Sequence, residues 1–563
     1  MKRTAPVTRI LLAFVILVPT LLAASTWRIF GHTWDEPEHL AAGIELLDRG
    51  RYEYDTEHPP IGRILMALGP YLAGARSWGT PPPDGVQEGV DILYRSGHYD
   101  EYLTLARVGT MPFFVLLLLA LWLWARQIAA TQSEALLTLV MLATVPPILG
   151  HAALAALDVA AAGTTLFALY WLQRWIVSGQ WAAAALFGLT TGLAVATKFS
   201  AIPFIALGLV VLAATRAVLG ALERGSAAQP PWPAVTRRAQ IGGLALALAV
   251  SFVPIVLAYG IHSADPRLVT RRFDWAVSYL LPGHGWAFDA AIAAGAVLPR
   301  ALQLLLEGVV SLKAHNDTGH VSFLLGHLQA HGWWYFYLVA LAAKTPLPLL
   351  LTGPVGLALM SRDGWRERDL WRLAPLLLFA TLLIFASTFS HINIGIRHML
   401  ILYPFLALGA SYVLARGWRA LAAVGSVHLA NAGRALIVVL IGWQASLLWT
   451  AYPDYLAYFN ETIANPQHVL VDSDLDWGQD LRRLEWALAA LKVKNVSLAY
   501  QGTADLAREP LPPFTRLLPG HPARGWIAIS ALAREHYSRG YSWLDAYRPI
   551  ERIGKTIDLY YIP

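Results

Sequence analysis

Long apolar segments recur along most of the chain and are separated by shorter polar stretches. A membrane-spanning helix needs roughly 17–25 mostly apolar residues. Several of the segments are short, but their number is typical of a multi-pass membrane protein. We predict about eleven spans, near Ile10–Trp27, Val108–Trp124, Leu136–Ile148, Val159–Ile176, Trp181–Ala196, Ser200–Ala214, Ile241–Tyr259, Pro346–Met360, Leu373–Thr388, Met399–Ala415 and Ala435–Thr450.

The composition agrees with a membrane protein. Hydrophobic residues make up 56% of the 563 residues and charged residues only 14%, whereas soluble proteins carry about 25% charged residues. The formal charge of +6 is better explained by membrane topology than by nucleic-acid binding, because no basic stripe alternates with exposed aromatic residues. The chain has no cysteine, which excludes disulfides, zinc–thiolate sites, iron–sulfur clusters and thiol nucleophiles.

Arginine and lysine gather on alternate loops, and this asymmetry predicts the orientation. Basic residues in short loops mark the cytoplasmic side of a membrane protein. The N-terminus is therefore predicted inside and the C-terminal segment outside. The other loops predicted to face outward are 31–106, 149–158, 197–199, 260–343 and 390–398.

The apolar pattern ends near residue 451, which divides the chain in two. We predict an all-α polytopic membrane domain at residues 1–451, with large outer loops at 31–106 and 260–343, followed by a small α+β extracytoplasmic domain at residues 452–563. The expected elements of the second domain are a helix at Gln479–Leu491 and strands at Val496–Tyr500, Trp526–Ile529 and Ile557–Tyr561.

Two further segments have a distinct composition. Ala291–Leu312 is apolar but is interrupted by Arg300 and Glu307, so we predict an amphipathic helix at the membrane surface and not a span. Gly225–Val235 is rich in proline and alanine, which indicates a cytoplasmic linker.

Two adjacent carboxylates, Asp35 and Glu36, follow the first predicted span. Charges at a membrane surface are costly unless they have a function. If a helix begins here, Asp35, Glu38 and His39 share one face and Glu36 points elsewhere. A structural interpretation is equally open, with Asp35 as the N-cap and Glu38 completing a capping box.

Further polar residues lie in other loops predicted to face outward. Glu57 and His58 precede two prolines, which favour either a rigid turn or a site with His58 facing it. Asp158 stands at the mouth of a span, where an acid either faces a watery cavity or caps the helix.

Two isolated cations also lie in outward loops. Lys198, and Arg397 with its neighbour His398, run against the charge bias of that side. They either extend to lipid headgroups or form an anion clamp suited to a phosphate-bearing substrate.

An acidic string, Asp472, Asp474 and Asp476, suggests calcium binding. The EF-hand spacing fails, because the sixth position is Trp477 and the twelfth is Arg483. Metal binding, substrate contact and a structural turn all remain open. A metal trio of His315, Asp317 and His320 is a weaker alternative.

The order and common side of these motifs resemble the GT-C glycosyltransferases. Asp35-Glu36, His58-Pro59-Pro60, Asp158 and Thr197-Lys198 are similar to glycosyltransferase family 39, which includes protein O-mannosyltransferases and bacterial aminoarabinose transferases. The resemblance covers most of the membrane part. The string Leu475–Asp480 is similar to bacterial members with a C-terminal outer domain.

The resemblance implies an enzyme of the bacterial cytoplasmic membrane. It would transfer a sugar from a polyprenyl phosphate to an acceptor hydroxyl on the outer side, with inversion, in one displacement and without a metal or other cofactor. Lys198 and Arg397 would stabilise the leaving phosphate, and Asp35 would be the base. Glu36 or Asp158 would orient the reactants. The predicted substrate-binding residues also include His39, Glu57, His58 and His398.

Two other classes of protein compete with the enzyme. A transporter or flippase for lipid-linked sugars would show internal repeats and ionisable groups at mid-membrane, and the sequence shows neither. A membrane anchor for a partner-binding domain would leave the outward Asp, His and Lys residues of the membrane part unexplained. The sequence does not name the sugar or the acceptor.

Overall fold

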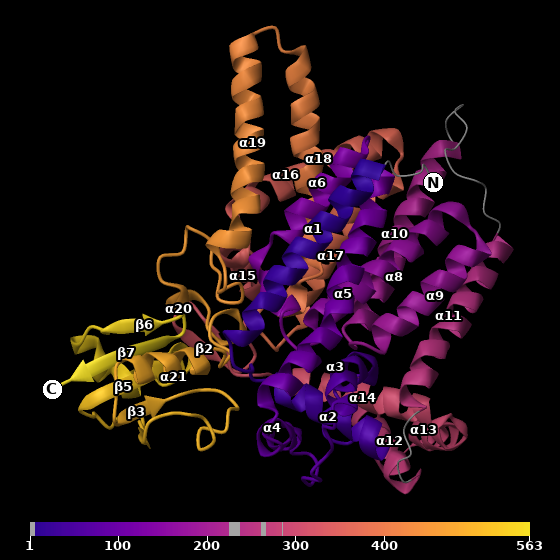
Figure 1. Ribbon diagram of the computed structural model, residues 1–563. Helices are drawn as coiled ribbons and strands as arrows, with labels where there is room; N and C mark the ends of the chain where they lie inside the picture. Colours follow the sequence, from indigo (N-terminus) through magenta and orange to yellow (C-terminus); the bar gives the residue numbers. More distant parts are fainter. Residues whose placement is uncertain (1–5, 225–236, 261–265, 284) are drawn as a thin grey trace.

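The computed structural model describes residues 6–224, 237–260, 266–283 and 285–563 (Figure 1). The predicted linker at 225–235 lies outside the described residues. Every segment predicted to span is helical. The helices are α1 Pro6–Ser25, α5 Tyr99–Ile128, α6 Gln132–Ala143, α7 Pro146–Ala152, α8 Asp158–Ser178, α9 Trp181–Val195, α10 Ala201–Arg224, α11 Arg237–Tyr259, α16 Leu347–Glu367, α17 Leu370–Phe389, α18 Leu402–Ala420 and α19 Val427–Thr450.

Within the described residues, 6 helices are long and apolar enough to cross a membrane, or up to 7 if the bent pair α6 and α7 counts as one span. Eleven spans therefore remain a prediction. The expected single helix at Leu136–Ile148 is wrong, because α6 and α7 meet at an angle of 68°. Pro146 and Pro147 begin α7, and their missing amide donors end the continuous helix before them.

Close helix contacts hold the bundle together. A Cβ atom on Gly356 of α16 would lie 1.7 Å from the Gly409 carbonyl oxygen of α18. A Cβ on Gly188 of α9 would lie 2.2 Å from the Ala247 oxygen of α11. Small residues let membrane helices approach closely enough for extensive van der Waals contact.

The two long polar loops fold into helices at one end of the bundle, the end nearer the sheet (Figure 1). The predicted helix at Ala291–Leu312 is wrong in extent, since Leu298 and Pro299 separate two helices there. The elements are η1 Thr26–Arg28, α2 Glu36–Arg49, α3 Pro60–Leu72, α4 Gly85–Arg95, α12 Pro266–Leu280, α13 Trp286–Val297, α14 Arg300–Thr318, the antiparallel hairpin β1 Ser322–Leu324 and β2 His327–Gln329, α15 Phe336–Lys344, and η2 Ile396–Met399.

The C-terminal part contains a five-stranded sheet in the order β4-β3-β5-β7-β6. Strand β3 runs parallel to β4 and β5, and β7 runs antiparallel to β5 and β6. The predicted helix and three strands are present, and the short β4 and β6 were not predicted. The elements are η3 Leu421–Ala423, α20 Pro466–Val469, η4 Asp472–Asp474, α21 Leu481–Ala490, β3 Val496–Ala499, β4 Phe514–Arg516, β5 Gly525–Ser530, α22 Ala531–His536, α23 Ser538–Tyr541, η5 Ser542–Ala546, β6 Glu551–Ile553 and β7 Ile557–Ile562.

The sheet region is attached to the first polar loop through polar contacts. Arg482 pairs with Asp100, and the Tyr94 hydroxyl donates to Glu509. The Gly31 amide donates to the Gln479 oxygen at 3.0 Å. These contacts bring the C-terminal part against the segment that leads into α2.

Candidate functional site

A cavity of about 1090 Å³ opens where the polar loops meet the helix bundle. Its wall is charged near the loops and apolar along the helices, where Phe204 of α10 and Phe385 and Phe389 of α17 line it. The predicted site residues on its surface are Asp35, His39, Glu57, His58, Asp158, Lys198, Arg397 and His398.

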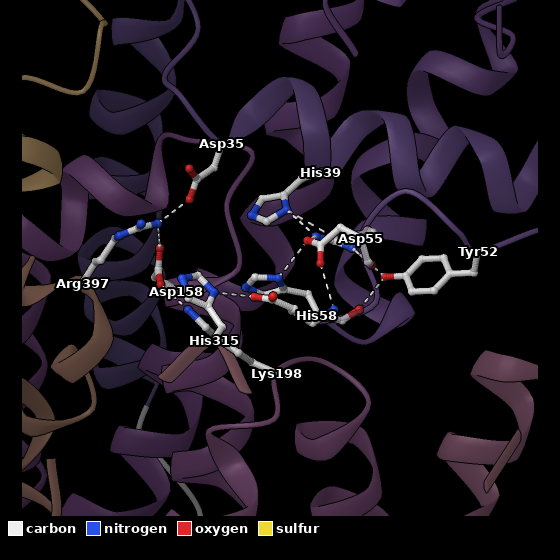
Figure 2. A network of polar contacts seen from close by, with 11 residues as sticks. Asp35, His39, Tyr52, Asp55, His58, Asp158, Lys198, His315 and Arg397 are labelled. Atoms are coloured by element: carbon white, nitrogen blue, oxygen red, sulfur yellow. Dashed lines mark hydrogen bonds and ion pairs between the residues drawn. The ribbon is translucent and has the colours of Figure 1, made fainter. Parts of the chain in front are cut away.

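Two acids and two cations from distant parts of the chain meet in this cavity, as predicted (Figure 2). Lys198 Nζ lies 2.6 Å from Asp158 Oδ1. Arg397 Nη1 lies 2.6 Å from Asp35 Oδ2 and 3.7 Å from Asp158 Oδ2. The four side chains form one continuous ion-pair chain, which balances two positive charges against two negative ones.

The four side chains of this ion-pair chain come from the ends of helices and from a short turn. Asp35 stands immediately before α2, and its side chain makes no capping hydrogen bond. Asp158 is the first residue of α8, where no side-chain cap is present. Asp35 thus occupies the predicted N-cap position without the hydrogen bond of a cap, and the N-cap of α8 is Leu157 and not Asp158. Lys198 lies in the turn after α9, and Arg397 lies in η2.

Glu36 does not line the cavity. Both side chains of the Glu36–Arg107 pair are about 1% exposed, and Arg107 Nε lies 2.8 Å from Glu36 Oε1. Glu36 also accepts from the amides of Thr33 and Ala155 at 2.8 Å. Although burial acts to raise its pKa, Arg107 and these donors hold the pKa of Glu36 below its usual value. The placement does not support the predicted reaction role of Glu36, because all of its acceptor capacity is used inside the protein.

Figure 2 also shows a second polar cluster around Asp55, of which Asp55, His39 and His58 line the cavity. His58 Nδ1 lies 2.9 Å from Asp55 Oδ2, and Arg63 also pairs with Asp55. Burial opposes ionisation of Asp55, but Arg63 and His58 hold its pKa well below its usual value. His39 contacts Arg63 through Nδ1, at 3.1 Å from Nη2, and burial together with Arg63 lowers its pKa.

Glu57 joins this cluster through His315, with 2.7 Å between Glu57 Oε2 and His315 Nδ1. The hydrogen bond to Glu57 raises the pKa of His315. Glu38 also lines the cavity, and burial together with Asp55 raises its pKa to about 8. Asp55 was not singled out from the sequence, and His315 was considered only as a metal ligand, because only the tertiary fold pairs Arg63 with Asp55 and His315 with Glu57. Glu38, Asp35 and His39, which were predicted to share one face, all line the cavity, but Glu38 was not assigned to the site.

His398 follows Arg397 in the chain, and its position there suggests a second cation. Its surroundings instead favour the neutral form. Burial, Lys198 and Arg397 lower its pKa well below the usual value. Its Nδ1 lies 3.5 Å from the Tyr337 hydroxyl. It therefore offers a neutral hydrogen-bonding group to the cavity and does not add charge to an anion clamp.

Two acids of the string accept hydrogen bonds from other segments of the chain. Asp476 accepts from the Leu532 amide at 2.8 Å, and Asp474 accepts from the Ile396 amide at 3.1 Å. Burial raises the pKa of both Asp472 and Asp476 to about 7. No group of three His, Cys, Asp or Glu residues arranged for a metal occurs in the described part of the chain. The string is a buried turn that connects two parts of the protein.

The trio suggested as an alternative metal site has other partners. His315 contacts Glu57, as described above, and Asp317 pairs with Lys313 at 2.5 Å. The Tyr279 hydroxyl donates to Asp317 at 2.7 Å. His320 Nδ1 lies 3.0 Å from the Val321 oxygen, and the ring centroids of His315 and His320 are 6.0 Å apart.

The fold of the chain is the GT-C fold of membrane glycosyltransferases. The protein O-mannosyltransferase Pmt1-Pmt2 complex of S. cerevisiae, solved with its sugar donor, is similar with a TM-score of 0.52 and 10% identity over 80% of this chain and 90% of that one. This likeness supports the predicted resemblance at the level of the fold.

Two further solved structures are similar at lower scores. ArnT from Cupriavidus metallidurans matches with a TM-score of 0.45 and 14% identity over 97% of both chains. The Archaeoglobus fulgidus oligosaccharyltransferase matches with a TM-score of 0.41 and 14% identity over 78% of this chain and 55% of that one. No protein-family model and no curated protein matches the sequence.

Proposed function

We propose that this protein is a membrane glycosyltransferase that moves a sugar from a polyprenyl phosphate to an acceptor hydroxyl. The observation that carries the proposal is the meeting of Asp35, Asp158, Lys198 and Arg397 in one cavity. The GT-C fold supports the reaction class. The sugar and the acceptor remain to be identified.

In the proposed reaction, the acceptor oxygen attacks the anomeric carbon as the bond from that carbon to the phosphate oxygen breaks. The acceptor proton passes to Asp35, and the lipid phosphate leaves with one more negative charge than it carried as a diester. Lys198 and Arg397 stabilise this charge, a contribution typically worth about 3–4 kcal/mol for a single well-placed donor. One displacement suffices, so the configuration at the anomeric carbon inverts.

Asp158 is proposed to hold both cations in place while the donor is absent. It contacts Lys198 at 2.6 Å and Arg397 at 3.7 Å. A carboxylate between two cations lowers the cost of keeping them buried. His58, His39, His398 and Glu57 then form the polar wall that contacts the substrates. The proposed steps require no metal ion.

The apolar wall suits the lipid part of the donor. Phe204, Phe385 and Phe389 line the cavity on helices of the bundle, next to the charged groups. A prenyl chain can follow this wall while its phosphate reaches Lys198. The positive-inside pattern of the loops supports a site on the outer side of a bacterial cytoplasmic membrane.

The test uses the full chain in lipid nanodiscs with polyprenyl-phosphate sugars and membrane extracts as acceptors. Mass spectrometry should detect a glycosylated product, and Asp35→Asn should abolish it in protein that thermal unfolding shows to be still folded. Deletion of the gene should remove the same product from envelope glycolipids or glycoproteins. In sealed proteoliposomes, movement of the lipid-linked sugar across the bilayer without product would instead identify a transporter. An active Asp35→Asn variant would exclude Asp35 as the base.

A further inference from the structure

Arg397 rests on an aromatic ring that comes from the C-terminal part of the chain. Its guanidinium carbon lies 4.3 Å from the ring centroid of Trp477. Trp477 is 2% exposed and Arg397 is 8% exposed. A cation–π contact is stronger when it is removed from water than when it is exposed. The same guanidinium thus contacts the Trp477 ring and the carboxylates of Asp35 and Asp158.

The segment around Trp477 also holds the chain that carries Asp35. The Trp34 amide donates to the Trp477 oxygen at 3.0 Å, and the Gly31 amide donates to the Gln479 oxygen at 3.0 Å. Trp34 and Trp477 belong to one apolar cluster with Leu154. Asp35 therefore follows directly after a segment that is hydrogen-bonded to residues 477–479.

The chain that carries Arg397 is held by the same segment. Asp474 accepts from the Ile396 amide at 3.1 Å, and the Ser473 hydroxyl donates to the Ile394 oxygen at 2.6 Å. A Cβ on Gly395 would lie 2.2 Å from the Ser473 hydroxyl oxygen. Residues 473–474 and 394–396 are thus in direct contact on both their backbone and side-chain atoms.

The segment is in turn attached to the sheet region. Asp476 accepts from the Leu532 amide at 2.8 Å, and the Thr556 hydroxyl donates to Asp480 at 2.9 Å. Both acids are about 1% exposed. The position of residues 473–480 therefore depends on the folded sheet region and not on the membrane helices alone.

We propose that Trp477 is a positioning residue, which holds the Arg397 guanidinium between Asp35 and Asp158 so that it can receive the donor phosphate. The C-terminal part then supports the site through its contact with Arg397, although residues 452–563 do not line the cavity. The identity of the ligand in this inference rests on the proposed function. The positioning of Arg397 by Trp477 does not depend on that function.

The first test measures binding of undecaprenyl phosphate to the full chain in nanodiscs. Trp477→Ala should weaken binding at least about tenfold, because the guanidinium loses its support. Trp477→Phe retains an aromatic face and should restore binding to within about threefold of the wild type. Trp486→Ala is the matched control, since Trp486 lies on α21 of the same region and is 53% exposed. Wild-type binding in Trp477→Ala protein that remains folded would overturn the proposal.

The second test needs no ligand, so it separates this inference from the proposed function. Thermal unfolding is measured for Trp477→Ala, Arg397→Ala and the double variant. If the ring holds the guanidinium, the effects on the unfolding temperature should be clearly non-additive. Additive effects would overturn the proposal even if wild-type protein transfers sugar. Non-additive effects with no wild-type binding of undecaprenyl phosphate would support the geometry and refute the proposed ligand.

Discussion

Glu36 and Asp35 are neighbours in the chain, yet their side chains have different surroundings. Glu36 pairs with Arg107 in the protein interior, and both side chains are about 1% exposed. Removal of one partner from a buried ion pair typically costs about 3–5 kcal/mol. We expect Glu36→Gln to lower the thermal unfolding temperature strongly while the folded fraction keeps its turnover rate.

Asp100→Asn serves as the control, because Asp100 is 77% exposed in its pair with Arg482 and exposed pairs are worth at most about 1 kcal/mol. Loss of turnover in a fully stable Glu36→Gln protein would instead restore a reaction role for Glu36.

Lys198 and Lys313 both line the cavity, but only Lys198 contacts the acid cluster. We expect Lys198→Met to lower kcat for sugar transfer by about 100-fold or more, as for the loss of one donor to a developing charge. Lys313 is 53% exposed and pairs with Asp317, so Lys313→Met should change kcat little. Equal effects of the two variants in steady-state kinetics would contradict the anion-clamp assignment.

Glu38 gives the site a pH dependence. Burial and Asp55 raise its pKa to about 8, so the folded protein retains a proton that the unfolded chain releases near its ordinary pKa. Stability should therefore fall as the pH rises from about 5 to 8, with no further fall from this group above about 8. Glu38→Gln should remove this part of the loss. The check compares the unfolding temperatures at pH 5 and pH 8 of the wild type, of Glu38→Gln and of Glu551→Gln, whose exposed position makes it the control. An equal loss of stability in Glu38→Gln and Glu551→Gln would contradict the assignment.

At the scale of the helices, α16 and α18 pack through a glycine contact. A Cβ on Gly356 would lie 1.7 Å from the Gly409 oxygen, so Gly356→Ala should force the helices apart. Overpacking of this kind costs about 1–3 kcal/mol, occasionally more. We expect a lower thermal unfolding temperature in nanodiscs.

Gly442→Ala in α19 is the control for this contact, because a Cβ there meets nothing within 4 Å. Alanine should be neutral or stabilising at that position, since it favours helix by about 1 kcal/mol over glycine. Similar losses in the two variants would show that helix separation is not the cause.

For the whole molecule, the absence of cysteine permits a direct test of orientation. The turn between α18 and α19 lies at the end of the bundle away from the sheet (Figure 1). We expect Ala507→Cys, in the sheet region, to react with an impermeant maleimide in right-side-out membrane vesicles. Gly425→Cys, in the turn, should react only after the vesicles are opened. The opposite labelling pattern would invert the proposed orientation.

The local pattern alone determined much of this protein. The positions of the helices follow from apolar length, and the strands at 496–499, 525–530 and 557–562 follow from short apolar runs. Asp35, Asp158 and Lys198 were found because charges next to membrane helices are rare. These features depend on neighbours within a few residues, so the sequence is enough to predict them.

Only the tertiary structure decided which groups meet. Asp35 faces the cavity and Glu36 does not, because Glu36 pairs with Arg107, which is 71 residues away. Arg397 is in turn supported by Trp477 from the C-terminal part. The Asp55–Arg63 pair likewise follows from packing. Such contacts join segments that no local periodicity relates, because burial and charge pairing are settled only when the helices and the sheet are packed together.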